Sequence, residues 1–391
     1  MGKFSNSAAS NKTLYAAVLA DAAKVTIFLY EYGSHQVRNY SSQDWDEYII
    51  TMRTDDGDFE LTGAIPPAGD RIIIDEPYTS AVLEALRSEA ATALNLYPDA
   101  ACRELAGLLA EQFGLGEENV LLANGSDDIL NFCFLAFCER GVVFPDVSYG
   151  FYEVFADLYH IDVRRPAMDE GLTIDPRDYT GTGRCVVIAN PNAQTGVALP
   201  LSAVEGIVKG SPESVVVVDE AYVDFGGETS APLVSKYPNV LVVRTFSKSG
   251  SLAGARLGYA LGPEPLIEDL KKLKYSTNPY SVNRTALAAG AAAVRDWAQC
   301  AANCRRIALE RRRLTAELVK RGFELTASSA NFVLARPCLI GAREYMEALR
   351  ERGILIRYLG GKLAAWVRIT IGTPEQMDAL LAATDEILKV S

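Results

Sequence analysis

The chain has 391 residues, 49% hydrophobic and 23% charged, which is typical of a soluble globular protein large enough for two domains. With 38 Lys and Arg against 50 Asp and Glu, its net charge of −12 argues against nucleic acid or an anionic membrane as the main partner. The sequence shows no apolar run long enough for a membrane span and no secretory signal pattern, so it predicts a cytoplasmic protein. Its seven cysteines form no Cys-x-x-Cys pair, and no metal site is predicted.

The first 70 or so residues combine different patterns. Residues 11–24 are compatible with a helix, whereas "KVTIFLYEYG", "EYIITMRTDDGDFELTG" and "RIIID" are strand-like. We treat residues 1–74 as an atypical N-terminal segment that joins the smaller domain.

From residue 75 to 287 the sequence alternates between helical and strand patterns. Apolar residues have helical spacing in 79–96, 100–115 and 127–138. Short apolar runs rich in Val follow in "GVVFP", "GRCVVIANP", "SVVVVDEAY" and "NVLVVRTF". Such runs suit central strands covered on both faces, so we expect an α/β domain with a mostly parallel sheet between helices.

The C-terminal residues 288–391 have another pattern. Residues 295–322 form one long amphipathic helical pattern. Strand-like segments "FELTASSANFVLARP", "ILIRYL" and "WVRITIG" and two further helical segments follow. We expect a smaller α+β domain here.

Polar residues follow several of the expected strands, at the edge where ligands bind in open α/β sheets. The amine of Lys248 can form a Schiff base with an aldehyde, and Asp219 can hold a protonated pyridine nitrogen. A phosphate can be bound by the start of the helix after residue 124 and by nearby hydroxyl and guanidinium groups. Together these chemistries describe a site for pyridoxal 5'-phosphate.

The sequence resembles the fold-type I pyridoxal-phosphate-dependent aminotransferases of class I/II, and within them most closely the histidinol-phosphate aminotransferase subgroup. The motifs that carry the resemblance are "NGSDD", "FPDVSYGFYEV", "ANPNAQTG", "VVDEAYVDFGGE", "VVRTFSKSGSLAGARLGYALG", "NPYSVNRTA", "ANFVLARP" and "WVRITIGT". The resemblance implies a large domain with a mostly parallel sheet of seven strands between helices, together with a smaller α+β domain.

The resemblance also implies residue roles. Lys248 would carry the cofactor and transfer protons, Asp219 would pair with the pyridinium nitrogen, and Tyr222 would donate to the ring oxygen. The other cofactor-binding residues would be Gly125, Ser126, Asp127, Tyr149, Asn192, Thr245, Ser247, Arg256 and Tyr78. Asn190 is a weaker alternative to Asn192 as the asparagine at the ring oxygen. Tyr152, Phe225 and Tyr259 are expected in the core or behind the site.

The residues expected to face the substrate are Arg368, Arg357, Asn331 and Tyr280. Arg368 would bind a substrate carboxylate through its planar guanidinium, and Arg357 either faces the same substrate or is a surface arginine. Asn331 is either a turn residue or helps to orient the carboxylate. Tyr78 and Tyr280 would reach the site of a second subunit, which implies a homodimer with shared active sites.

The function expected from this resemblance is the transfer of an amino group between an amino donor and a 2-oxo acid in amino-acid biosynthesis, with histidinol phosphate and 2-oxoglutarate as the default pair. Glu76 and Gly250 replace subgroup residues that suit an anionic substrate, and this favours other substrates. The alternatives are an aromatic or specialised biosynthetic aminotransferase, an enzyme similar to threonine-phosphate decarboxylase, and a non-catalytic sensor module that binds pyridoxal phosphate.

Overall fold

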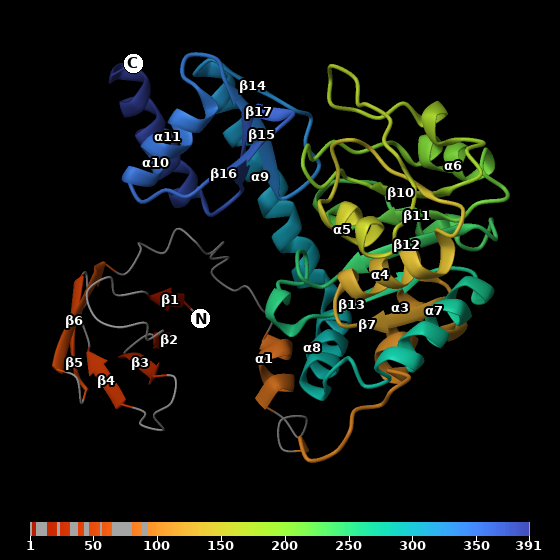
Figure 1. Cartoon of the computed structure of the whole chain (residues 1–391), viewed down its shortest axis with the longest axis horizontal. Coiled ribbons are helices and arrows are strands. Elements are labelled where there is room, and N and C mark those ends of the chain that lie inside the picture. The colour runs from red at the N-terminus through yellow and green to blue at the C-terminus, as the bar shows by residue number, and fades with distance from the viewer. Residues whose placement is uncertain are drawn as a thin grey trace. The chain divides into compact units, whose positions relative to one another are not determined.

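The computed structural model describes residues 80–87 and 93–390, together with six strands between residues 2 and 64 for which only the backbone is described (Figure 1). The chain divides into two compact units, residues 1–68 and 69–391. Glu76, Tyr78 and the strand-like "RIIID" lie outside the described residues.

The N-terminal unit consists of antiparallel strands. One sheet has the order β1-β2-β3-β4 and the other contains β5 and β6. The bounds are β1 (Gly2–Phe4), β2 (Leu14–Asp21), β3 (Lys24–Glu31), β4 (Arg38–Ser42), β5 (Glu47–Thr54) and β6 (Gly57–Ala64). The helix expected at 11–24 is therefore wrong. Every residue of β2 pairs with one of β3, and this long-range pairing outweighs the helical preference of the alanines in the segment.

A seven-stranded sheet forms the centre of the second unit, with the order β7-β13-β12-β11-β10-β8-β9. The four pairs from β12 to β9 are parallel, which confirms the expected mostly parallel sheet, whereas β13 runs antiparallel to both of its neighbours. The strands are β7 (Val120–Ala123), β8 (Val142–Val143), β9 (Val163–Arg164), β10 (Cys185–Ala189), β11 (Val216–Asp219), β12 (Val240–Thr245) and β13 (Gly258–Leu261).

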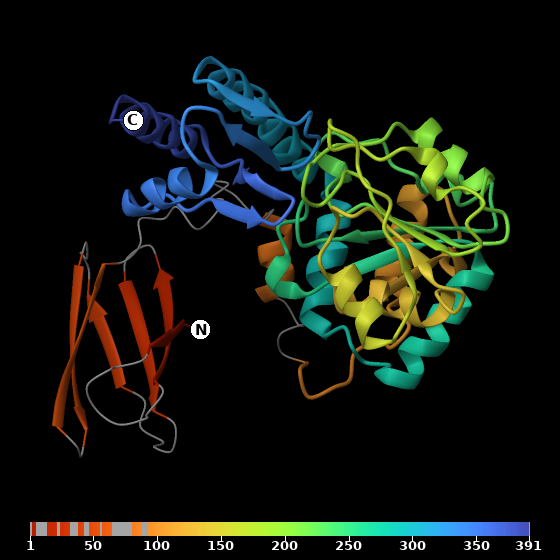
Figure 2. The same ribbon diagram turned by 45° about the horizontal axis from the view of Figure 1, so that its top comes forward.

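Both faces of this sheet are buried under helices (Figures 1 and 2). In β11, Val216 and Val218 belong to one apolar core and Val217 belongs to the other, because side chains alternate along a strand. The first core contains α1 (Ser80–Arg87), α3 (Arg103–Phe113), α6 (Leu201–Lys209) and α8 (Arg284–Arg295). The second contains α4 (Ser126–Phe137), α5 (Phe151–Leu158) and α7 (Glu264–Thr277). The continuous Val runs in the sequence reflect this two-sided burial.

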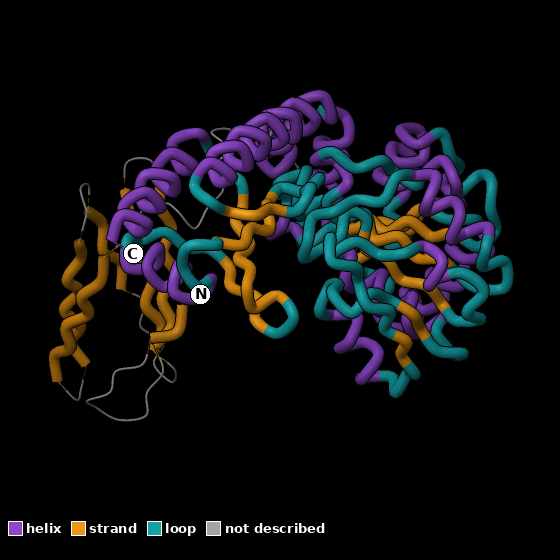
Figure 3. The backbone as a smooth tube through the Cα atoms, turned by 90° about the horizontal axis from the view of Figure 1, so that it is seen from above, coloured by secondary structure: helices purple, strands orange, loops and turns teal. Residues whose placement is uncertain are grey.

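A second, antiparallel sheet follows, with the order β14-β15-β17-β16. Val333, Val367 and Ile369 pack with the helices on one face, whereas Leu334 belongs to a different apolar cluster. Figure 3 shows the helices of this part on one side of its strands. The bounds are α9 (Trp297–Lys320), β14 (Phe323–Leu325), β15 (Phe332–Pro337), α10 (Ala342–Glu351), β16 (Arg357–Gly360), β17 (Leu363–Thr370) and α11 (Pro374–Val390).

Five short 3-10 helices connect these elements in the described chain: η2 (Glu117–Asn119), η3 (Pro176–Tyr179), η4 (Val223–Phe225), η5 (Ala231–Leu233) and η6 (Ala253–Ala255). The domain boundary predicted at residue 288 falls inside α8, whose buried side chains pack in the core of the seven-stranded sheet. None of the helices in the described part of the chain is long and apolar enough to cross a membrane.

Candidate active site

The carboxyl ends of β11 and β12 and the start of α4 open into one cavity of about 150 Å³. This volume is of the size that accepts an aromatic ring. Its position at the strand ends follows the general rule for open α/β sheets. Most of the residues predicted for the site line it, together with three alanines: Ser126, Asp127, Tyr149, Ala193, Asp219, Ala221, Tyr222, Thr245, Ser247, Lys248, Ala253 and Arg256.

Lys248 lies three residues beyond the end of β12, and its side chain reaches the cavity. Its Nζ lies over the ring of Tyr222, 5.4 Å from the centroid. The Tyr222 ring in turn packs edge-on against Phe332 with centroids 5.2 Å apart. The amine therefore lies against an aromatic wall, which favours its position through a cation–π contact.

Asp219 ends β11 and is 4% exposed. Burial raises its pKa to about 6, although hydrogen bonds from Tyr152 and from the Ala221 amide oppose this shift. The Tyr152 hydroxyl donates to Oδ2 at 2.7 Å and the Ala221 N–H donates to Oδ1 at 3.2 Å. A carboxylate buried in this way is stabilised by a cation in the cavity.

We expect Asp219 to make the ligand-free protein lose stability as pH rises. The folded pKa of about 6 lies above the ordinary value of 3.8, so the folded state holds the proton more tightly. The stability from this proton is present below pH 4 and is lost as pH rises through 6, by about 2 kcal/mol between pH 4 and pH 7. The free energy of unfolding, measured with urea at both pH values, should decline less from pH 4 to pH 7 in Asp219→Asn than in the wild type. Equal declines would contradict the assignment.

Another part of the cavity lining is suited to an anion. The helix α4 begins at Ser126, so its first backbone N–H groups have no partner within the helix. Arg256 lies beside them, with Nη2 3.3 Å from Asp127 Oδ2, and the Tyr149 hydroxyl donates to Asp127 Oδ1 at 3.0 Å. Gly125 has φ +89°, and a Cβ there would lie 2.5 Å from Arg256 Nη2. The positive φ favours glycine here, and a side chain would also displace the Arg256 guanidinium.

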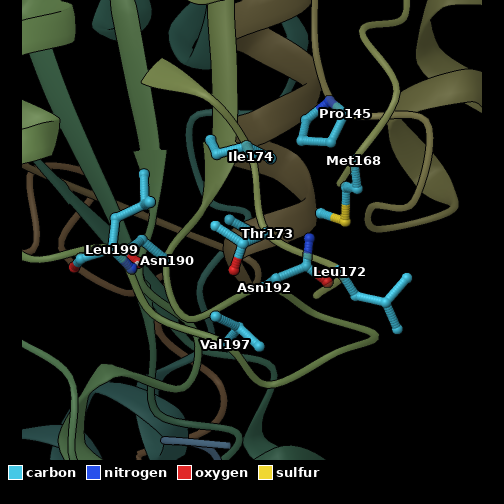
Figure 4. A pocket seen from close by; sticks show the side chains of 10 residues that line it. Pro145, Met168, Leu172, Thr173, Ile174, Asn190, Asn192, Val197 and Leu199 are labelled. Atoms are coloured by element: carbon cyan, nitrogen blue, oxygen red, sulfur yellow. Dashed lines mark hydrogen bonds between the residues drawn. The ribbon is translucent and has the colours of Figure 1, made fainter. Parts of the chain in front are cut away.

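The structure does not bring the Asn192 side chain to this cavity. Asn192 Nδ2 donates to the carbonyl of Val147 at 2.9 Å, and its Oδ1 accepts from two backbone N–H groups of its own loop. Asn190 is bound on both sides to the backbone of Leu199. Both asparagines instead line a separate cavity of about 20 Å³ (Figure 4). Ala193 is the residue of this motif that faces the active-site cavity.

Arg368 and Arg357 lie directly opposite each other on the paired strands β17 and β16. Arg368 Nη1 donates to the carbonyl of Ala193 at 3.0 Å, and its guanidinium lies over the ring of Phe332 at 4.8 Å from the centroid. Phe332 also packs against Tyr222, which lines the cavity, so one aromatic ring separates the Arg368 guanidinium from a lining residue. Burial lowers the pKa of Arg368, and the neighbouring charge of Arg357 lowers it further. A substrate anion would relieve this repulsion.

The remaining predicted residues lie away from the cavity lining. Tyr280 is 44% exposed and stacks on Tyr97 with ring centroids 4.6 Å apart. Asn331 holds the start of β15 by accepting the Ile371 N–H with its backbone carbonyl. Their roles toward substrate or a second subunit stay predictions.

The sequence placed Tyr152 in the core or behind the site and singled out Gly250, but the contacts of these two residues were not predicted. Tyr152 is fully buried and donates directly to Asp219, so it supports the carboxylate from behind. Its place in the "SYGFYEV" motif was the available signal. Gly250 stands where a Cβ would lie 2.9 Å from the carbonyl oxygen of Phe246, so this backbone does not accommodate an arginine there.

Comparison with known proteins identifies the family. The profile of the family described as Aminotransferase class I and II matches residues 67–383. This chain belongs to that family. A histidinol-phosphate aminotransferase of Acetobacter pasteurianus is 44% identical over 309 residues, which cover 78% of this chain and 87% of the relative. Histidinol-phosphate aminotransferase 1 of Hydrogenovibrio crunogenus is 39% identical over 356 residues, covering 89% and 99%.

A solved structure agrees with these relatives. The histidinol-phosphate aminotransferase from Sinorhizobium meliloti in complex with pyridoxal-5'-phosphate has 26% identity to this chain and a TM-score of 0.72, and the match covers 80% of this chain and 88% of that one. The fold-type I architecture expected from the sequence is confirmed, and the chain is an aminotransferase.

Proposed function

We propose that this aminotransferase uses pyridoxal 5'-phosphate bound in the cavity of Lys248. The residues fit such a group at three points. The buried carboxylate of Asp219 requires a cation, which the protonated pyridine nitrogen supplies. The start of α4 and Arg256 are suited to its phosphate, and Lys248 lines the same cavity. The single observation that carries the proposal is that Asp219, Lys248 and the start of α4 with Arg256 line one cavity large enough for an aromatic ring.

The bound group supplies an electrophilic aldehyde and a ring that accepts electrons. The protein supplies the rest. Asp219 keeps the ring nitrogen protonated, while Tyr152 and the Ala221 N–H hold its carboxylate in place. Tyr222, which lines the cavity, would donate from its hydroxyl to the ring oxygen. The Lys248 amine would hold the cofactor covalently at its aldehyde carbon, and once the amino donor has displaced it from that carbon, the free amine would move a proton between the donor carbon and the aldehyde carbon.

We infer a substrate with an anionic group at the far end from the amine, of the type represented by histidinol phosphate. Relatives with that name share 39–44% identity with this chain over most of their length. Arg368 and Arg357 lie side by side, and within the described residues neither forms an ion pair with a carboxylate. Two adjacent guanidinium groups suit a phosphate or a carboxylate. The amino acceptor is a 2-oxo acid, with 2-oxoglutarate as the first candidate.

A screen of amino donors tests this function. The purified holoenzyme is mixed with single donors, including histidinol phosphate and aromatic amino acids, and conversion of the aldehyde form of the cofactor to its amine form is followed by absorbance. Histidinol phosphate should give the fastest conversion. Faster conversion by an aromatic amino acid selects the aromatic enzyme, and release of carbon dioxide from a phosphorylated amino acid selects the decarboxylase.

We further propose a homodimer in which each subunit contributes to the partner's site. The exposed Tyr97 and Tyr280 form a stacked aromatic pair on the surface, and Arg284 fixes it by donating to the Tyr97 carbonyl at 2.9 Å. Exposed aromatic pairs of this kind are enriched in protein interfaces. Sedimentation of wild type and Tyr280→Ser at several concentrations tests the assignment, which predicts weaker dimerisation in the variant.

Replacing Arg368 by lysine should raise the KM for both substrates about tenfold, with a smaller change in kcat. Lysine keeps the positive charge but loses the two parallel N–H donors and the stacking on Phe332. A tenfold change corresponds to about 1.4 kcal/mol of binding free energy. Steady-state kinetics separates the change in KM from the change in kcat. Arg336→Lys is the control, because Arg336 pairs with Glu324 and stacks on Trp366 outside the cavity lining. An equal KM change in both variants would contradict the role.

A further inference from the structure

A buried polar network lies directly behind the active site. Asp224, in the turn η4, accepts hydrogen bonds on both carboxylate oxygens. Arg244 Nη2 donates to Oδ1, and the Ser249 hydroxyl donates to Oδ2 at 2.6 Å. The Arg244 side chain is 5% exposed, and its Nε lies 3.9 Å from Glu220 Oε2. The guanidinium also lies over the rings of Phe113 and Tyr259.

Each member of the network is a close neighbour in sequence of a residue that lines the cavity. Glu220 follows Asp219, Asp224 comes two residues after Tyr222, and Ser249 follows Lys248. Arg244 precedes Thr245 at the end of β12. Two separate segments that carry the reacting groups, residues 219–224 and 244–249, are thus joined behind the cavity by one set of side chains.

The bond between Ser249 and Asp224 is the only part of this network that holds the loop after Lys248, as far as the described residues show. Ser249 is 7% exposed, so its hydroxyl needs a partner inside the protein. The next residue, Gly250, packs closely against the carbonyl of Phe246. The loop is therefore fixed on one side by close packing and on the other by the Asp224 carboxylate.

Buried charges of this kind are weak contributors to stability, because desolvation offsets much of the attraction between them. In this network the charged groups hold the two segments in a fixed position relative to each other. A lysine side chain has four rotatable bonds, so the direction of its amine depends on how firmly its backbone is held. A small displacement of a reacting group costs far more in rate than in stability.

We propose that Ser249 and Asp224 are positioning residues that fix the backbone of Lys248 relative to the Tyr222 turn, so that the lysine amine is presented to the aldehyde of the cofactor. This inference rests on the proposed function, because it takes Lys248 as the residue that binds the cofactor. Ser249 and Asp224 act through Lys248 and do not line the cavity themselves.

Ser249→Ala tests the proposal, with Thr229→Val as its matched control. The Thr229 hydroxyl donates to Glu220 Oε2 at 2.7 Å, so both variants remove one neutral donor from a carboxylate of the same network. Thr229 is far from the Lys248 loop in sequence and forms no hydrogen bond with it among the described contacts. The ligand-free proteins are mixed with pyridoxal phosphate, and the rate of covalent capture at Lys248 is measured by borohydride trapping across a range of pH, next to Tm, kcat and KM.

Ser249→Ala should slow capture about tenfold and alter its pH profile, and should lower kcat more than it changes KM. Thr229→Val should lower Tm by a similar amount but change the capture rate by less than about twofold. Capture by Ser249→Ala at the wild-type rate, or equal slowing in both variants, would overturn the proposal. If the wild type itself captures no cofactor, the proposed function is wrong. This result differs from the failure of the positioning role, in which the wild type still captures the cofactor.

A double-mutant cycle adds a second test. Asp224→Asn removes the charge that holds both Arg244 and Ser249, so it should slow capture at least as much as Ser249→Ala. The double variant should be no slower than Asp224→Asn alone, because the single acceptor oxygen of asparagine has to face Arg244, which only donates, and this leaves no acceptor for the Ser249 hydroxyl. Additive slowing would show that the two residues act independently. If Asp224→Asn does not fold, the comparison of Ser249→Ala with Thr229→Val still decides.

Discussion

Lys248→Ala should lower kcat by about 10⁴-fold or more, because one side chain provides both the attachment of the cofactor and the proton transfer. Its amine is the only lysine amine at the cavity in the described chain. The alanine variant should still fold, since Lys248 is only partly buried and makes no ion pair in the described residues. Single-turnover kinetics with the amine form of the cofactor measures the effect.

A small primary amine in the buffer provides the control for this variant. It can replace the missing base and should partly restore the turnover of Lys248→Ala, whereas it should not affect the wild type. Lys274→Ala is the comparison for a buried lysine elsewhere, because Lys274 donates to the Ala100 carbonyl and to Cys102 outside the cavity. Activity of Lys248→Ala within tenfold of wild type would contradict the role of Lys248.

Asp219→Asn should lower kcat by roughly 10²–10³-fold, comparable with the loss of one preorganised electrostatic contact in an active site. Asparagine has nearly the same shape as aspartate, but it keeps one acceptor oxygen, so it can accept from Tyr152 or from the Ala221 N–H and not from both. It cannot carry the charge that keeps the ring nitrogen protonated. The cofactor should therefore bind, with an altered absorbance spectrum, and react slowly. Stopped-flow absorbance with a single amino donor measures the reaction step.

Tyr152→Phe is a graded control for the same carboxylate. It removes the 2.7 Å hydrogen bond to Oδ2 but leaves the charge in place. This hydrogen bond opposes the effect of burial on the Asp219 pKa, so its loss should raise that pKa further. We expect a loss of kcat of about tenfold or less, clearly smaller than for Asp219→Asn. An equal loss of kcat in both variants would show that the hydrogen bond from Tyr152, and not the charge of Asp219, determines the loss.

Much of the site follows from the sequence for physical reasons. The central strands are continuous Val-rich runs because both faces of their sheet are buried, and this pattern is unambiguous. Parallel strands bring their carboxyl ends to one edge, so Asp219 and Tyr222 after β11 meet Lys248 after β12 there, although the two segments are apart in sequence. The anion-binding start of α4 is marked by its Gly-Ser-Asp sequence.

Other features depend on contacts that the sequence does not reveal. Asn192 is an acceptable cofactor ligand by its type, but its amide is used by the backbone of Val147 and of its own loop. The segment 14–21 is short and rich in alanine, so its strand state depends on its pairing with β3. The bond between Ser249 and Asp224 joins positions 25 residues apart and follows no sequence period.

The most direct test of the role of Lys248 is to locate the covalent bond between the protein and its cofactor. The purified protein is incubated with pyridoxal phosphate, reduced with borohydride, digested and analysed by mass spectrometry. We predict one modified peptide per chain, containing "RTFSKSG", with the label on Lys248 and none after an amino donor has been added before reduction. A label on another lysine, such as Lys274, or no label at any lysine, would contradict it.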